Sequence, residues 1–248
     1  MLKRKITNIH LPPPEFIETF LRYYYHIPPL ALFRTVEARH LSKLEFTMPM
    51  LDLGCGDGFF SSVLFANRPG DIFACDLNAL EIEKAKKRAF YREVRVADAT
   101  TLPYSAKQFA TVFSNCVLEH IPNLSQVLKE VSRILKKDGK FVFTVPSEHF
   151  VSYLYHYRRF QEHGKAEEAK RYAIQLNQRL QHYHYYTPRE WEERLAEAGL
   201  RLESYGYYLS QETEAFWDRL THIYIQKFLG CELHVYLFYL LKYLGLRH

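Results

Sequence analysis

The 248-residue chain contains few cysteines and no long apolar run. Its four cysteines, Cys55, Cys75, Cys116 and Cys231, show no metal-ligand spacing, so we expect neither a disulfide framework nor a cysteine metal site, which suits a reducing compartment. No stretch reaches 18 consecutive uncharged apolar residues, so we expect no transmembrane helix. The basic N-terminus is followed by prolines at residues 12–14, and no apolar stretch of the kind found in signal peptides lies between them. We therefore expect no signal peptide and a cytoplasmic protein.

Neither sign of charge predominates strongly in the chain. The 33 basic and 28 acidic side chains give a formal net charge of +5, a mild excess that serves solubility. No basic run is dense enough to follow a nucleic-acid backbone, so we expect no nucleic-acid partner. The content of 48% hydrophobic and 25% charged residues is that of an ordinary globular protein. At this length we expect one domain over residues 1–248.

Between residues 48 and 146, strand-like and helix-like patterns alternate. This alternation predicts an α/β fold with a doubly wound, parallel sheet and with ligands at the carboxyl ends of the strands. One predicted helix, over residues 123–139, has a clear apolar face and Gly139 as its C-cap. The other predicted helices cover residues 59–67 and 79–91. The predicted strands cover residues 48–54, 71–78, 94–99, 109–115 and 140–146.

The flanking regions are predicted to be mostly helical and rich in aromatic residues. In one helix Thr187 is the expected N-cap, Glu190 completes a capping box and Gly199 ends the helix. Residues 200–209 alternate like a strand. The predicted flanking helices cover residues 14–26, 30–43, 147–164, 166–181 and 187–199.

The C-terminal tail, residues 216–248, is apolar and aromatic. We expect it to be helical, with a strand around residues 233–241 as the alternative, because short apolar runs fit both. Residues 229–248 would pack in the fold by the simpler interpretation. By the other, they lie on a membrane with basic side chains toward the headgroups, which would place the protein at the membrane periphery and favour an apolar or lipid-like ligand.

Three glycines, Gly54, Gly56 and Gly58, alternate directly after the first core strand. The dinucleotide-binding fingerprint would place its third glycine at position 59, where this chain has Phe59. No lysine or arginine occurs between residues 50 and 67 to meet a phosphate. The spacing therefore argues against a pyrophosphate ligand and against a nicotinamide enzyme.

Three acidic residues near the glycine loop indicate which class of ligand the loop binds. Asp52 precedes the loop, Asp76 ends the second strand about 22 residues after Gly54, and Asp98 ends the third. An acid at the position of Asp76 typically accepts hydrogen bonds from ribose hydroxyls, and Asp98 could accept one from an adenine amino group. Three acids around a bare backbone favour a cationic adenosine ligand.

These features resemble the class I S-adenosylmethionine-dependent methyltransferases, and within them the small-molecule branch with a "LEH" segment after the fourth strand. The resemblance covers residues 47–148 and implies a Rossmann-like, mostly parallel, seven-stranded sheet. It further implies an N-terminal helical lid over residues 1–46, and a C-terminal region over residues 149–248 that shapes the acceptor site. The segments that carry it are LDLGCGDG, ACDLN, VADATTLPYS and SNCVLEHIPNLSQVLKEVSRILKKDGKFVFTVPSE.

The resemblance also assigns roles in holding S-adenosyl-L-methionine. The loop glycines let the backbone approach the methionyl part, Asp52 orients its ammonium group or the loop, and Asp76 holds the ribose. Leu77 packs on the purine, which is read by Asp98 with the next amide, and Asn115 contributes near the amino-acid end. The full expected set is Asp52, Gly54, Cys55, Gly56, Asp76, Leu77, Asp98, Ala99 and Asn115.

Methyl transfer needs alignment of the reactants, and it needs a general base only if the acceptor must lose a proton. His120 is the first candidate base, because the resemblance places it at the strand ends. His182, His184 and Tyr186 occupy every second position, so in an extended segment their side chains would lie on the same side. The alternative is that Glu119 and His120 only fix their loop and that the later histidines are surface residues. No metal spacing is seen, so we expect no metal.

The sequence thus predicts an enzyme that moves a methyl group from S-adenosyl-L-methionine to a small molecule, preferably at oxygen. Transfer to nitrogen or carbon is one alternative. A non-catalytic cofactor-binding protein or a membrane-associated partner protein is another. The acceptor and the oligomeric state stay open.

Overall fold

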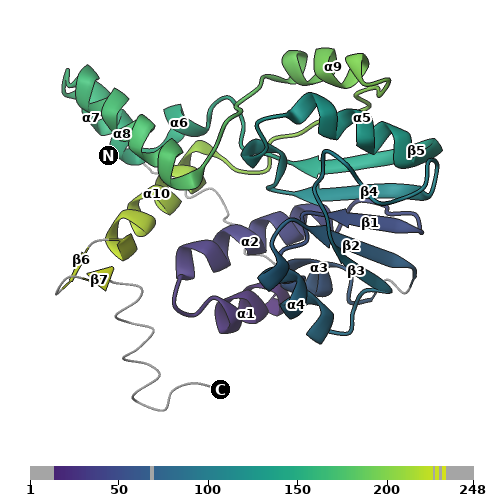
Figure 1. Cartoon of the computed structure of the whole chain (residues 1–248). Coiled ribbons are helices and arrows are strands. Elements are labelled where there is room, and N and C mark those ends of the chain that lie inside the picture. Colours follow the sequence, from purple (N-terminus) through teal and green to yellow (C-terminus); the bar gives the residue numbers. More distant parts are fainter. Residues whose placement is uncertain (1–13, 68–69, 226, 229–230, 233–248) are drawn as a thin grey trace, which may run out of the picture. The chain divides into compact units, whose positions relative to one another are not determined.

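A computed structural model of the chain describes residues 14–67, 70–225, 227–228 and 231–232 (Figure 1). The described residues form two compact units, one that combines residues 14–43 with those described between 220 and 232, and one within residues 44–219. The expected division into one domain with an N-terminal lid stays a prediction.

The smaller unit holds the two expected N-terminal helices, α1 (Pro14–Tyr23) and α2 (Pro28–Leu41). Two prolines occupy the first positions of α2, where a missing N–H costs no helical hydrogen bond. Two two-residue strands, β6 (Lys227–Phe228) and β7 (Cys231–Glu232), pair antiparallel. Residues 233–248, where the tail could form a strand or contact a membrane, lie outside the described residues. Within the described residues no helix combines the length and the apolar character that crossing a membrane requires.

The larger unit is built on a sheet of five parallel strands in the order β3-β2-β1-β4-β5 (Figure 1). From β1 the chain proceeds to one edge and then returns to form β4 and β5 on the other side, so the switch point lies between β1 and β4. The doubly wound α/β class is confirmed, although the described residues give this sheet five strands and not seven. The strands are β1 (Met50–Leu53), β2 (Ile72–Asp76), β3 (Glu93–Val96), β4 (Phe109–Asn115) and β5 (Leu135–Thr144).

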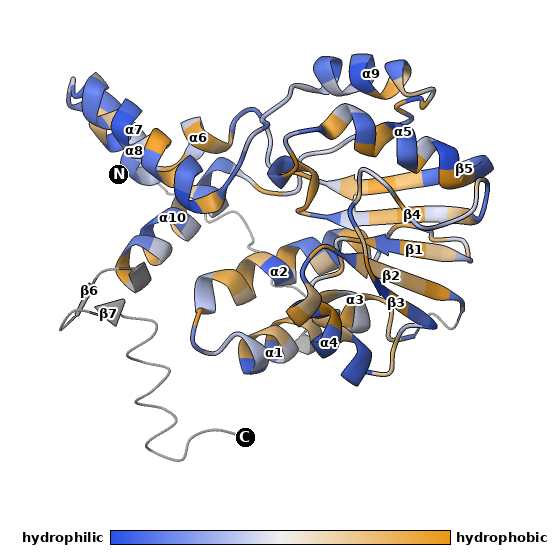
Figure 2. Ribbon diagram, viewed as in Figure 1, coloured by the Kyte–Doolittle hydropathy of each residue, from blue (hydrophilic) through white to orange (hydrophobic). Residues whose placement is uncertain are grey.

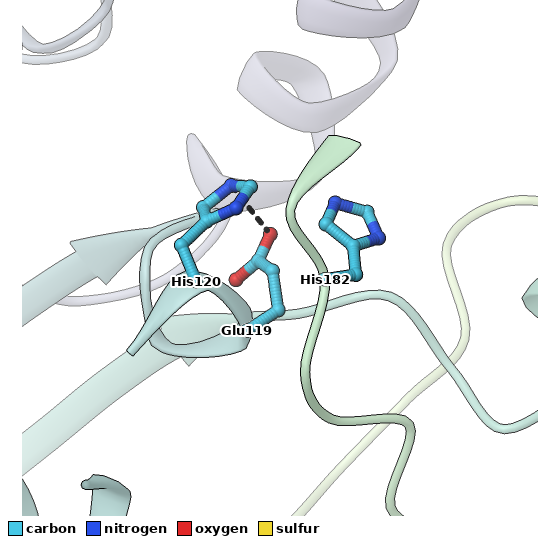
Figure 3. Close-up of side chains that lie close together, drawn as sticks. All are labelled: Glu119, His120 and His182. Atoms are coloured by element: carbon cyan, nitrogen blue, oxygen red, sulfur yellow. Dashed lines mark ion pairs between the residues drawn. The ribbon is translucent and has the colours of Figure 1, made fainter. Parts of the chain in front are cut away.

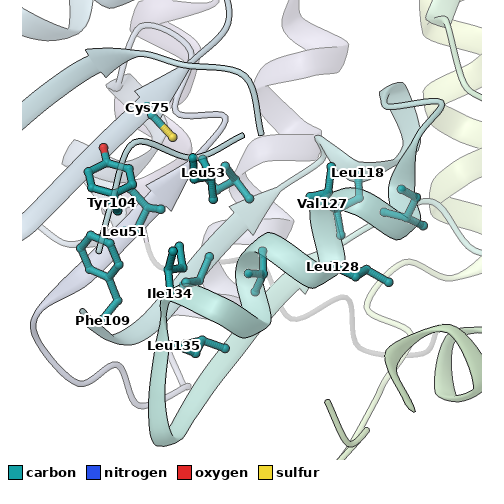
Figure 4. Close-up of a cluster of buried hydrophobic side chains, with 14 of the residues drawn as sticks. Leu51, Leu53, Cys75, Tyr104, Phe109, Leu118, Val127, Leu128, Ile134 and Leu135 are labelled. Atoms are coloured by element: carbon teal, nitrogen blue, oxygen red, sulfur yellow. The ribbon is translucent and has the colours of Figure 1, made fainter. Parts of the chain in front are cut away.

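Helices follow the strands as the alternation predicted. The central core lies between the sheet and α5, whose buried face includes Val127, Leu128 and Val131 (Figure 4). In Figure 2, β1 and β2 are largely hydrophobic in colour, whereas α9 is mostly hydrophilic. The helices of this unit are α3 (Phe59–Leu64), α4 (Ala79–Lys87), the 3₁₀ turn η1 (Leu118–His120), α5 (Leu124–Ile134), α6 (Phe150–Tyr153), α7 (Tyr155–Glu162), α8 (Ala166–Leu180) and α9 (Pro188–Glu197); α10 (Gln211–Ile225) begins in it.

The expected end of the α5 helix at Gly139 is wrong. The helix ends at Ile134, and Leu135 is already extended and buried as the first residue of β5. Phe109 pairs with Leu135 while Thr111 pairs with Lys140, so four residues of β5 lie opposite a single residue of β4. Leu135, the last apolar residue of the helical pattern, is therefore buried as part of the sheet and not of the helix.

The strand expected at residues 200–209 is also wrong, because this segment has no regular secondary structure and pairs with no strand of the sheet. Leu200 and Leu202 pack against the main core, whereas Tyr205 and Tyr207 are exposed, so only the first part of the alternating pattern is buried. The helix beside it is as predicted: α9 has Thr187 as its N-cap with a complete capping box to Glu190.

Some of the aromatic residues after position 149 form a second core. Phe150, Leu154 and Leu176 are buried together, and Tyr185 and Trp217 pack against them. This core fixes α6, α8 and the first half of α10 to one another. It also positions the extended segment of residues 181–187 that leads back toward the sheet.

Candidate functional site

The glycine loop turns sharply at the carboxyl end of β1. The amides of Gly54 and Cys55 both donate to the carbonyl of Cys75 at the end of β2 (2.8 and 3.1 Å). Gly54 has a φ of +76°, and a Cβ there would lie 2.5 Å from a methyl carbon of Val117. Glycine is therefore required both by the backbone conformation and by the close packing of Val117.

Gly56 presents bare main chain to open space. Its φ is +54°, and a Cβ built on it would meet no atom within 4 Å. Its amide donates to Oδ2 of Asp76 (2.8 Å). The neighbouring Cys55 thiol contacts the Gly56 carbonyl (3.4 Å), and burial, with nearby Asp52, raises its pKa so that it stays neutral. A ligand could therefore lie directly against this backbone.

Asp76, at the end of β2, is held by two main-chain donors. Besides the Gly56 amide at Oδ2, the Asn78 amide donates to Oδ1 (2.8 Å). Each carboxylate oxygen can accept a second hydrogen bond, so the group is oriented and still able to accept from a ligand. Leu77 and Leu80 beside it are 71% and 74% exposed. An acceptor next to exposed apolar surface suits a ribose joined to a purine.

Asp98 lies two residues beyond the end of β3. Its Oδ1 accepts from the amide and the hydroxyl of Thr100 (2.8 and 2.7 Å). These two bonds lower the pKa of Asp98, so it is ionised. Both contacts use Oδ1, which leaves Oδ2 to accept from an exocyclic amino group, with the amide of Ala99 adjacent in the chain.

Asp52 lies beneath the loop and is almost completely buried. Burial raises its pKa to about 6, although hydrogen bonds from Ser61 and Tyr91 act in the opposite direction. The Tyr91 hydroxyl donates to Asp52 Oδ2 (2.6 Å), and its ring covers Gly58, where a Cβ would lie 2.7 Å from Cε2. Asp52 is thus tied to the loop through Tyr91. Sequence reasoning missed Tyr91, because only the fold brings it to Asp52.

Asn115 ends β4 at the same edge of the sheet. Its Oδ1 accepts from the hydroxyl of Thr144 in β5 (2.7 Å), and the next amide, that of Cys116, donates to the same hydroxyl oxygen (3.1 Å). Cys116 has a φ of +53°, and the turn there places Val117 over Gly54. The segment that leaves β4 is therefore built against the glycine loop.

Residues 181–186 run alongside the η1 turn and are tied to it by three hydrogen bonds. Because carbonyl oxygens only accept, each histidine nitrogen in these bonds is a donor. The bonds join the amide of Tyr183 to the carbonyl of Glu119 (2.8 Å), His120 Nδ1 to the carbonyl of Gln181 (3.2 Å) and His184 Nε2 to the carbonyl of Ile121 (2.8 Å).

This pairing brings Glu119, His120 and His182 together (Figure 3). One potential ligand atom from each of the three lies within 4.8 Å of the others. Glu119 is buried, and its Oε1 is 3.8 Å from His120 Nε2. Burial, with a smaller effect of His120, lowers the pKa of His182 to about 4, so its imidazole is neutral. We call these three residues the Glu–His–His cluster.

His184 is placed differently from His182. Its Nε2 is engaged by the Ile121 carbonyl, and its Nδ1 accepts from the Tyr186 hydroxyl (3.0 Å). The rings of His184 and Tyr186 also stack, with centroids 5.1 Å apart. The structure therefore brings His182, and not His184, to the Glu119–His120 pair.

Comparison with known proteins finds a family match over the central part of the chain. Residues 51–143 match a family model described as a methyltransferase domain. A malonyl-[acyl-carrier protein] O-methyltransferase of Legionella pneumophila is 34% identical over 99 residues, which cover 38% of this chain and 35% of that protein. A ubiquinone biosynthesis O-methyltransferase of Coxiella burnetii is 27% identical over 134 residues, which cover 51% and 56%. The matched part of the chain thus spans between about a third and about half of the length of these relatives.

Solved structures show the same fold. A chain from the complex of the Haloferax volcanii Trm112 methyltransferase activator with a methyltransferase superposes with a TM-score of 0.54 and 20% identity, covering 76% of this chain and 78% of that one. A SAM-dependent methyltransferase of Thermotoga maritima gives a TM-score of 0.52 and 18% identity, covering 74% and 79%. Residues 51–143 thus match a methyltransferase domain, and the fold of the chain is the one seen in S-adenosylmethionine-dependent methyltransferases.

Proposed function

We propose that this protein transfers the methyl group of S-adenosyl-L-methionine to an oxygen atom of a small molecule. One observation carries the proposal: the bare backbone of Gly56 borders the oriented carboxylate of Asp76, with Leu77 exposed beside it. This arrangement can receive an adenosine that continues along the main chain of the loop. The methyltransferase domain that residues 51–143 match implies the same cofactor class.

The residues that would hold the cofactor form one rim along the ends of β1 to β4. Asp76 would accept from the ribose hydroxyls through charge-assisted hydrogen bonds. Asp52 would act through Tyr91 and the loop, since its hydrogen bonds point there. We call this set the cofactor rim: Asp52, Gly54, Cys55, Gly56, Asp76, Leu77, Asp98, Ala99 and Asn115.

The bound cofactor supplies a methyl group already activated on a sulfonium. The protein has to align the acceptor and exclude water, which can contribute several kcal/mol to lowering the barrier. A hydroxyl acceptor also has to lose its proton. His120 is the first candidate to take it, because Nδ1 donates to a carbonyl and Nε2 keeps its lone pair. His182 is the second candidate, whereas both nitrogens of His184 are engaged.

Oxygen as the acceptor atom is supported by the two relatives above, both named O-methyltransferases. An amine acceptor that is already neutral would need no base, and the Glu–His–His cluster would then have no proton to take. A lipid-like acceptor and contact with a membrane through residues 229–248 stay predictions.

Transfer is tested with the full chain and methyl-labelled S-adenosyl-L-methionine against phenols, carboxylic acids and amines of similar size. We expect labelled ether or ester products together with released S-adenosylhomocysteine, and none with the Asp76→Ala variant. An exposed histidine outside the site, His163, offers the matched control His163→Gln, which should keep full activity. Label that passes only to amines would contradict oxygen as the acceptor.

A further inference from the structure

The Glu–His–His cluster has the composition of a metal site. It combines one carboxylate and two imidazoles, and the three potential ligand atoms lie within 4.8 Å of one another (Figure 3). Glu119 and His120 come from the turn after β4, while His182 comes from a segment about 60 residues later. A local ion pair that merely fixes the η1 turn would not need His182.

The hydrogen bonds around the cluster prepare both imidazoles to donate lone pairs. His120 Nδ1 donates to the Gln181 carbonyl, which leaves the lone pair on Nε2. His182 Nδ1 is 2.8 Å from the Tyr185 hydroxyl, which itself donates to Asn177 Oδ1 (2.7 Å). Tyr185 must therefore accept from His182, so His182 also keeps its lone pair on Nε2. Metal-binding histidines are typically oriented by such bonds from their second nitrogen.

The spacing is close to what a bound ion requires. A tetrahedral ion with bonds of about 2.1 Å holds neighbouring ligand atoms roughly 3.4 Å apart. The distance from Glu119 Oε1 to His120 Nε2 is 3.8 Å, and no separation within the set exceeds 4.8 Å. Side-chain rotations that shorten the longest of these separations by up to about 1.4 Å would complete the geometry.

We propose that Glu119, His120 and His182 bind one divalent first-row transition-metal ion, contrary to the sequence-based expectation of no metal. Two imidazoles with one carboxylate suit Zn²⁺, Mn²⁺, Fe²⁺ or Co²⁺, whereas Mg²⁺ and Ca²⁺ prefer sites made of oxygen atoms. Three protein ligands leave coordination positions open for another molecule, as catalytic metal sites do.

The role of the ion rests on the proposed function. The open positions would take the hydroxyl oxygen of the acceptor and lower its pKa. The hydroxyl proton then leaves to water, because His120 Nε2 is engaged by the ion. The oxygen forms its bond to the methyl carbon as the carbon–sulfur bond breaks, and the sulfur keeps the electron pair. His120 and His182 then hold the ion in place of acting as bases.

Metal binding is tested without cofactor or acceptor, on the full chain after treatment with a chelator. Titration calorimetry with ZnCl₂ should give one ion per chain with a Kd in the micromolar range or tighter, and Co²⁺ should give visible absorption bands. MgCl₂ should bind at least ~100-fold more weakly than ZnCl₂. Glu119→Gln and His182→Gln should each weaken Zn²⁺ binding by ~100-fold or more, because each removes a ligand, while His163→Gln should bind as the unmodified chain does.

Circular dichroism and thermal unfolding show whether each variant folds. If Glu119→Gln does not, Tyr185→Phe gives a second test, since it removes only the oxygen that orients His182 and should weaken binding ~10-fold. The proposal is overturned if the unmodified chain binds no Zn²⁺ below about 1 mM, if the variants bind as it does, or if Mg²⁺ binds more tightly. Metal binding without methyl transfer would count against the proposed function alone. Methyl transfer at full rate in chelator, with no metal bound, would count against the metal site alone.

Discussion

The two sides of the candidate site are built in different ways. The cofactor rim uses main-chain amides and short acidic side chains, each placed by the end of a neighbouring parallel strand. The Glu–His–His cluster joins two segments about 60 residues apart and depends on which nitrogen of each imidazole carries the proton. The difference teaches that the fold alone places the rim, whereas the cluster needs a second, aromatic core to position its third member.

The largest effect is expected from the glycine where the two sides meet. Gly54→Ala forces a side chain into a positive φ and against Val117, so we expect a loss of about 2–5 kcal/mol in the free energy of unfolding. Gly56→Ala has only the conformational cost, about 1–2 kcal/mol, because nothing crowds its Cβ. Urea unfolding of both variants measures this. Equal losses would contradict the packing of Val117 on the loop.

Asp76→Ala breaks the rim and leaves the cluster intact. It removes the acceptor for the Gly56 amide and for two proposed ribose hydrogen bonds, so the Kd for S-adenosylhomocysteine should rise ~100- to 1000-fold. The matched control is Asp71→Ala, since the Asp71 side chain lies outside the rim in an exposed ion pair with Arg92. Equilibrium dialysis measures the affinity of both variants. If Asp71→Ala weakened binding as much as Asp76→Ala, the rim would be misassigned.

Asp52 gives the rim a pH dependence. Its pKa of about 6 in the folded chain lies above the ordinary 3.8, so between about pH 4 and pH 6 the folded chain keeps a proton that the unfolded chain loses. The free energy of unfolding should therefore fall as the pH rises through this window, by up to about 3 kcal/mol. Asp52→Asn should lack this component. Urea unfolding at pH 4.5 and pH 7 checks the prediction, which fails if the two proteins show the same dependence.

The smallest effect is expected at the helix that follows the cluster segment. Thr187→Ala removes the capping box of α9 and should lower the free energy of unfolding by about 1 kcal/mol. Thermal unfolding measures it. Metal binding at the Glu–His–His cluster should be unchanged, because the cluster is held by the bonds of residues 181–184 to the η1 turn. Weaker metal binding would show that α9 also positions His182.

The sequence predicted where the rim residues lie on the sheet, because local rules fix their positions, while their role in holding a cofactor stays a prediction. Gly54 and Gly56 follow a strand, and Asp76 ends the next one, so the parallel sheet alone places them together. Tyr91 could not be predicted, since only packing brings its hydroxyl to Asp52.

Long-range contacts also explain the failures. Periodicity extended α5 to Gly139, but the sheet takes Leu135 as its own core residue. The alternation of His182 and His184 predicted a shared face, whereas hydrogen bonds to the η1 turn and to Tyr186 send their rings to different partners. Neither the burial of Leu135 by the sheet nor the hydrogen-bond partners of the two histidines can be predicted from the local sequence.

The most direct test of the account is calorimetric titration of S-adenosylhomocysteine and of NAD⁺ into the unmodified chain. The account predicts one S-adenosylhomocysteine per chain with a Kd in the micromolar range, and no heat from NAD⁺. It also predicts that His182→Gln binds S-adenosylhomocysteine as the unmodified chain does, because the cluster lies outside the rim. Binding of NAD⁺, or no binding of S-adenosylhomocysteine, would contradict it.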